Sequence, residues 1–143
     1  MKRFGLSILF LFFSVAIFAQ NGNVPAAVKN AFTAKYPNVQ PTWIQANDGF
    51  RANFVKDGKD ICALFHDNGD YINSATKVNL ADLPSAIQND IQTRFSNYQL
   101  VECRILNNAD GSINYEYQYQ ANNMNVEVFF DASGSIVRRN IVN

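Results

Sequence analysis

Cys62 and His66 are the two residues of this chain that most resemble a catalytic pair, because His66 is its single histidine and a thiol lies just upstream. An imidazole activates a thiol for nucleophilic attack when the two heavy atoms lie about 3 Å apart. The local pattern predicts a strand, on which these two residues would be separated by roughly 13 Å. Cys103 is predicted on the opposite face of the sheet. We therefore expect no thiol–imidazole catalysis.

The segment from His66 to Asp70 offers carboxylate and amide oxygens, which are the ligands of hard cations such as calcium. A calcium loop needs six or more such oxygens from a longer series, and Asn68-Gly69 is also a hairpin-turn signal. We predict a turn here and no metal. The chain has no glycine-rich phosphate loop, paired-cysteine motif or nucleophile elbow, so we expect a non-enzymatic protein without a cofactor.

The first residues of the chain predict export. Lys2 and Arg3 precede an apolar run from Phe4 to Phe18, and the small residue Ala19 follows, which is the order of a secretory signal peptide. A membrane anchor is the alternative, but the run is shorter than the roughly 20 residues that span a bilayer. We assign residues 1–19 to a signal peptide and residues 20–143 to one periplasmic or secreted domain, with no membrane span.

The charge of the chain argues against nucleic acid as a partner. Lys and Arg number 12 and Asp and Glu number 12, and removal of Lys2 and Arg3 leaves a slight negative excess. Because phosphate binding needs clustered positive charge, and no basic run is present, we expect no nucleic-acid binding.

The chain repeats itself. The segment 24–30 returns as 83–89, and the segment 65–71 returns as 130–136. Such self-similarity indicates one supersecondary unit used twice. Helices are expected over 25–36 and 84–95, and turn residues divide each following stretch into four short strands. The sequence predicts an α+β fold with two tandem pseudo-repeats, 24–78 and 83–142, each one helix packed on a four-stranded antiparallel meander.

Alternation along the strands, together with the alignment of the two repeats, assigns their faces. Tyr117 is expected inside, beneath the second helix, in preference to a ligand platform. Cys62 is expected on the outer face and Cys103 on the inner one, so we predict no disulfide between them. The alignment of the two repeats matches Trp43 with Glu102, which predicts Trp43 at the surface and Ile44 inside.

An apolar outer patch with a tryptophan and an arginine has the composition of a protein-binding hot spot. Two other interpretations stay open: the first repeat folds this face onto the second, or the tryptophan fills a bend. The residues that we predict to form the binding surface are Trp43, Arg51, Val55, Leu64 and Phe129.

A pattern of proline, aromatic, aliphatic and glycine residues recurs in order along the chain, namely Pro25, Val28, Phe32, Tyr36, Pro37, Trp43, Phe65, Gly69 and Tyr71, then Leu83, Pro84, Ile87, Phe95, Phe130 and Gly134. This pattern resembles the exported PepSY-like family of Bacteroidetes-type bacteria, which is described as β-lactamase-inhibitor-protein-like. The resemblance implies tandem helix-plus-sheet modules in envelope or secreted proteins and no established activity; PepSY-type modules are thought to restrain secreted peptidases. It implies no catalytic residues.

These observations favour an exported, non-catalytic binding module, inhibitor-like in character, that engages a protein partner in the cell envelope or medium through an outer sheet face. The alternative is a periplasmic binder of a small molecule or an envelope component that uses the seam between the two repeats. A buried cavity at that seam would favour the alternative, and an exposed Trp43 would favour protein binding.

Overall fold

The computed structural model describes residues 23–142, so the predicted signal peptide lies outside the described residues. The fold is α+β, as predicted. The first half contains α1 (Ala26–Lys35), β1 (Thr42–Ala46), β2 (Gly49–Lys56), β3 (Lys59–Phe65) and β4 (Tyr71–Val78). After a short 3-10 helix, η1 (Leu80–Asp82), the second half contains α2 (Ser85–Arg94), β5 (Gln99–Asn108), β6 (Ile113–Ala121), β7 (Met124–Phe130) and β8 (Ile136–Val142).

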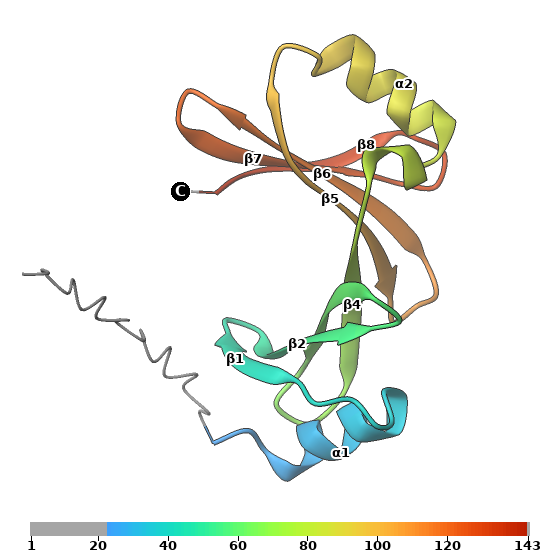
Figure 1. Cartoon of the computed structure of the whole chain (residues 1–143). Coiled ribbons are helices and arrows are strands. Elements are labelled where there is room, and N and C mark those ends of the chain that lie inside the picture. The colour runs from blue at the N-terminus through green and yellow to red at the C-terminus, as the bar shows by residue number, and fades with distance from the viewer. Residues whose placement is uncertain (1–22, 143) are drawn as a thin grey trace, which may run out of the picture.

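All eight strands form a single antiparallel sheet in chain order, from β1 at one edge to β8 at the other. The sheet is continuous across the two halves because β4 pairs with β5. Figure 1 shows the sheet bent into a C, with α1 outside one arm and α2 outside the other. The inner face of the C carries neither helix.

Each helix is positioned by its ends and by one apolar stripe. Pro25 precedes α1, where its missing N–H is not needed, and its carbonyl accepts a hydrogen bond from the Lys29 N–H at 3.1 Å. Pro37 follows Tyr36 and prevents continuation. A ten-residue helix is only marginally stable in isolation, so burial of Val28 and Phe32 against the sheet holds it in place.

The helices cover the same face of the sheet, over two separate cores. Phe32 of α1 packs with residues of β1, β2 and β3, including the fully buried Ala63 and Phe65. Ile87 of α2 packs with residues of β5, β6 and β7, including Tyr117, which is 3% exposed. The burial of Tyr117 confirms the prediction that it lies beneath the second helix.

The predicted exposure of Trp43 is wrong. Trp43 is only 9% exposed and lies in the core beneath α1, whereas Ile44, predicted inside, is 46% exposed. The pairing register gives the reason: Trp43 lies opposite Ala52, and Cys103 lies opposite Tyr117. The residue that corresponds to Trp43 is therefore Cys103 rather than Glu102.

An irregularity in β5 explains the one-residue error. The β5–β6 register shifts between Leu100 and Glu102, so Val101 is an extra residue without a partner. One more residue consequently separates Phe95 from Cys103 than separates Tyr36 from Trp43. Because side chains alternate along a strand, an offset of one residue exchanges the two faces.

Candidate binding face

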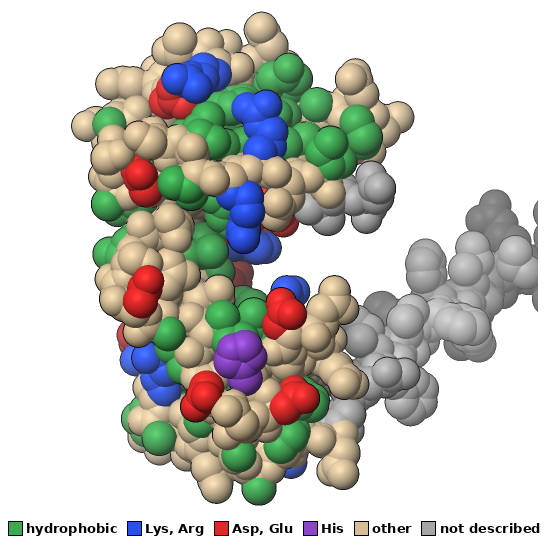
Figure 2. Space-filling view, turned by 180° about the vertical axis from the view of Figure 1, so that it is seen from behind, with side chains coloured by type: hydrophobic (Ala, Val, Ile, Leu, Met, Phe, Trp, Pro, Cys, Tyr) green, Lys and Arg blue, Asp and Glu red, His purple; other side chains and the backbone are tan. Residues whose placement is uncertain are grey.

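The concave face of the sheet holds a groove of about 920 Å³ to which every strand contributes at least one side chain. Apart from Phe54 and Ile61, the strand side chains that line it have the opposite parity from those in the two cores, so this is the face without helices. Figure 2 shows the molecule hollowed between its two arms, with Lys and Arg side chains along one arm. The groove is open to solvent along its length.

A row of side chains crosses this face from β4 to β8, because strand pairing places them directly opposite one another. The row is listed in order of strands: Lys77, Arg104, Glu116, Phe129 and Arg138. Side chains opposite each other on one face lie about 4.5–5.5 Å apart at Cβ and interact directly. The row is therefore one continuous strip across the second arm of the C.

Together with Glu102, the first three residues of this strip form a network of alternating charges. Glu102 accepts from Lys77 Nζ at 3.2 Å and also pairs with Arg104, whose Nη1 lies 3.6 Å from Glu116 Oε2. Glu116 is 4% exposed, and acidic side chains are seldom buried unless they are paired. Burial raises the pKa of Glu116, while Arg104 opposes the rise. Two positive and two negative groups thus fix one another across the floor of the groove.

At the far end of the strip, the Arg138 guanidinium lies over the Phe129 ring, 4.0 Å from its centroid. Phe129 is only 6% exposed although it is on the concave face. Such stacking holds the planar cation in a fixed orientation. Arg138 therefore covers the Phe129 ring at this end of the strip.

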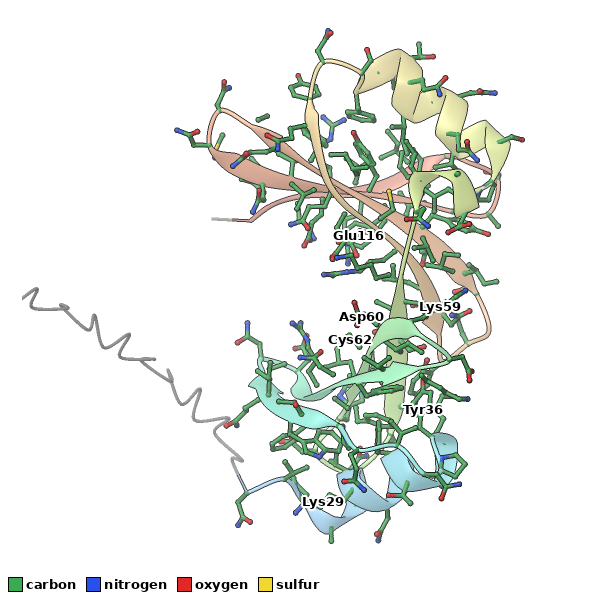
Figure 3. The ribbon with its side chains drawn as sticks, in the orientation of Figure 1. Lys29, Tyr36, Lys59, Asp60, Cys62 and Glu116 are labelled. Carbon is green, nitrogen blue, oxygen red and sulfur yellow. The ribbon has the colours of Figure 1, made fainter. Side chains whose placement is uncertain are left out.

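The first arm of the C contributes apolar side chains and one thiol to the lining of the groove. Arg51 lies opposite Leu64 in the sheet, and Val55 of the same strand is 62% exposed. Cys62 is half-buried beside them, and burial raises the pKa of its thiol although Arg51 and Arg104 oppose the rise. Figure 3 shows Cys62 and Glu116 on the inner side of the C and Lys29 on the outer side.

Four of the five predicted binding residues line this groove, namely Arg51, Val55, Leu64 and Phe129. Trp43 does not, since it lies on the other face of the sheet. The charged strip was not predicted from the sequence. Its signal is present in the alternation of charged residues along β5 and β6, but their pairing became visible only with the register.

His66 and the cysteines do not form a site together. Cys62 lines the concave groove, whereas His66 lines a separate polar depression of about 510 Å³, where its Nδ1 lies 3.2 Å from the Asp48 carbonyl oxygen. The segment 66–70 is a hydrogen-bonded turn, as predicted, in which the Gly69 N–H donates to the His66 carbonyl at 2.9 Å. Cys62 and Cys103 are free thiols on opposite faces of the sheet.

Two features are absent from residues 23–142. Within this range we find no group of three or more His, Cys, Asp or Glu side chains arranged to hold a metal ion. The same range contains no helix that combines the length and the apolar character needed to cross a membrane.

Comparison with solved structures places the fold among Bacteroides proteins. A Bacteroides eggerthii protein provisionally assigned to the periplasm is 21% identical and superposes with a TM-score of 0.76, covering 85% of this chain and 91% of its own. A DUF2874 family protein of Bacteroides uniformis is 19% identical with a TM-score of 0.74, covering 82% of this chain and 89% of its own.

A BLIP-like protein of Bacteroides fragilis is 21% identical with a TM-score of 0.69, covering 82% of this chain and 86% of its own. At these identities the likeness is one of fold, and it agrees with the resemblance inferred from the sequence. No family model matches this chain, and no curated protein matches it.

Proposed function

We propose that this chain is a periplasmic, non-catalytic binding module that holds a segment of a partner protein against the concave face of its sheet. The observation that carries the proposal is the groove of about 920 Å³ to which all eight strands contribute. A small ligand contacts a compact set of residues in an enclosed pocket. A groove that is open and extends across the whole sheet fits a longer occupant.

The composition of the groove supports a protein as the occupant. Ile44 is an exposed apolar side chain opposite Arg51, and the exposed Val55 lies farther along the same strand and face as Arg51. Apolar contacts flanked by arginine are typical of protein interfaces. The ion-paired strip adds fixed charges of both signs, which select a partner by complementarity more than they add affinity. The BLIP-like name of one structural neighbour supports the inhibitor-like version of this proposal, in which binding blocks the partner's activity.

The same proposal includes the organisation of the chain. Residues 24–78 and 83–142 are two copies of one unit, after a signal peptide over 1–19 that directs export. Support comes from the element order, in which each helix precedes four strands, and from matching pairs in the two halves. Phe50 lies opposite Phe65, as Tyr115 lies opposite Phe130.

A photo-crosslinking experiment tests the function. Benzoylphenylalanine at Val55, which is exposed on the concave face, is expected to give a covalent adduct with a protein in the periplasmic extract of the host. The matched control is the same amino acid at Lys29, which is exposed on α1 on the convex side. Adducts from both positions or from neither would contradict the proposal.

A second variant distinguishes the alternatives. Arg51→Ser combined with Val55→Ser should abolish the adduct from a crosslinker placed at Ile44 without changing the circular dichroism spectrum, because both replaced side chains are exposed. If the low-mass fraction of the extract raises the melting temperature instead, and no adduct forms, the small-molecule or envelope-component alternative is correct.

A further inference from the structure

We propose that β8 is a second docking site, at which an extended acidic segment of another protein adds to the sheet as a ninth strand. This site shares Arg138 with the concave groove, but it uses the edge of the sheet rather than its concave face. Its elements, within residues 23–142, are an unpaired strand edge, two stacked arginines with no acidic group within 4.0 Å, and exposed apolar side chains on either side of them.

The outer edge of β8 is unpaired among residues 23–142, since the strand order ends there and β7 is its only neighbour. An edge strand presents a row of N–H and C=O groups that a further strand can satisfy. Ile141 is 63% exposed and Val137 is 55% exposed, so apolar side chains of an added strand would find contacts next to the backbone.

Arg138 and Arg139 are consecutive residues in the middle of this edge, and each lies over an aromatic ring on its own face of the sheet. Arg138 stacks on Phe129 with 4.0 Å between the guanidinium carbon and the ring centroid, and Arg139 lies 5.5 Å from the centroid of Phe95. Neither makes an ion pair within 4.0 Å in the described part of the chain. The edge therefore offers a fixed cation on each face.

Charge decides which strand fits. Two β8 strands paired symmetrically about their centre would place arginine opposite arginine, and like charges opposite each other are destabilising. Charged edge residues commonly prevent such self-association. An acidic strand has the complementary charge and would neutralise both cations, so the edge discriminates between a second copy and an acidic partner.

The register defines the sequence of the segment. Arg138 and Arg139 point to opposite faces, so two adjacent acidic residues of an antiparallel segment would lie opposite them. Arg139 and Ile141 share the helix-side face, because they lie opposite Val128 and Val126 of the α2 core. An apolar residue two positions before the first acid would then lie opposite Ile141.

The probe is a fluorescein-labelled, end-blocked peptide with the order threonine, isoleucine, threonine, glutamate, glutamate, valine, threonine. We expect its fluorescence anisotropy to rise on titration with the full mature protein at low salt. A peptide with two lysines in place of the glutamates should not bind. If the glutamate peptide fails to bind, or the lysine peptide binds equally, the proposal is wrong.

Variants of the protein locate the site. Arg139→Glu, which lies outside the concave groove, should weaken binding about tenfold because attraction becomes repulsion, and Arg138→Glu combined with Arg139→Glu should accept the lysine peptide. The matched control is Lys59→Glu, at an exposed hairpin position, which should leave affinity unchanged. Equal losses in the Lys59 and Arg139 variants would show non-specific charge attraction and overturn the proposal.

Backbone methylation tests strand addition separately from charge. N-methyl groups on alternate residues of the peptide block one of its two hydrogen-bonding edges. Methylation of the alternate residues whose N–H groups face β8 should abolish binding. Methylation of the other alternate residues, whose N–H groups face solvent, should be tolerated. If both methylated peptides bind, pairing with β8 is contradicted. Because Arg51→Ser leaves this edge intact, a failure of groove binding and a failure of edge binding are distinguishable.

Discussion

Trp43 packs edge-on against Phe32, with 5.3 Å between the ring centroids and an interplanar angle of 71°. The contact joins β1 to α1, because Trp43 is the inward-facing residue of an edge strand and Phe32 lies on the buried stripe of the helix. Edge-to-face aromatic pairs of this kind add about 0.5–1.5 kcal/mol beyond the burial of their area. The tryptophan therefore belongs to the structural core of the first half.

Replacement of Trp43 by alanine should lower the free energy of unfolding by about 3–5 kcal/mol, since a large buried side chain is lost and a cavity remains. The matched control is Ile44→Ala on the exposed face of the same strand, for which we expect a change within about 0.5 kcal/mol. Urea unfolding of both variants measures the difference. Iodide should quench the fluorescence of native Trp43 only weakly, and strong quenching would contradict its burial.

The wrong prediction for Trp43 shows which parts of the fold can be predicted from the sequence. Helix positions, turns and the inward residues of β2 are predictable, because periodicity and turn residues act locally. The face of β1 was derived from the other half of the chain, and the extra residue at Val101 carries no local signal. A bulge is stabilised by pairing with a neighbouring strand, so only the sheet reveals it.

The candidate site likewise contains residues whose exposure the sequence predicts and residues whose burial it does not. The exposure of Arg51 and Val55 follows from alternation within a single strand, and the structure agrees. The burial of Glu116 does not, since it depends on Arg104 from β5, Phe129 from β7 and Arg138 from β8. Groups that become neighbours only through strand pairing require the register before their chemistry can be inferred.

Gly69→Ala should destabilise the protein through a contact between the β3–β4 turn and α1. Gly69 has φ +93°, and a Cβ there would lie 2.8 Å from the carbonyl oxygen of Ala27. Backbone atoms at a helix start cannot yield as a flexible side chain can. The control is Gly58→Ala, with φ +72° and open space around it, which should cost only about 1–2 kcal/mol from the left-handed conformation. Equal melting temperatures for the two variants would refute this contact.

The two thiols should differ in reactivity. Cys103 is 2% exposed, and burial, with contributions from Glu102 and Glu116, raises its pKa to about 11. Because the thiolate is the reacting species, DTNB at mildly alkaline pH should label Cys62 slowly and leave Cys103 unmodified in the native protein. Cys62→Ser should therefore abolish native labelling. After denaturation without reductant, both thiols of the wild-type protein should react, and the absence of reactive thiols would reveal a disulfide.

Glu116 should give the protein a pH dependence of stability opposite to that of an ordinary surface carboxylate. Burial raises its folded pKa above the ordinary value of 4.5; Arg104 and Arg138 oppose the rise, and Glu127 and Glu102 add to it. Between the unfolded and folded pKa values the folded state binds more protons, so the contribution of Glu116 falls as pH rises through this window. Asp110 and Asp131 act in the other direction, because hydrogen bonds from Ser112, Ser133 and Ser135 lower their pKa values.

Glu116→Gln isolates this contribution, because glutamine keeps the shape of the side chain and does not titrate. The free energy of unfolding of the variant, minus that of the wild type, should become more positive as pH rises from below 4.5 toward neutrality. The contributions of Asp110 and Asp131 cancel in this difference, since both proteins retain them. Urea titrations at a series of pH values measure it, with Glu127→Gln as a more exposed control on the same face. A difference for Glu116→Gln that stays constant with pH would show that the carboxylate is not held in an environment that disfavours its charge.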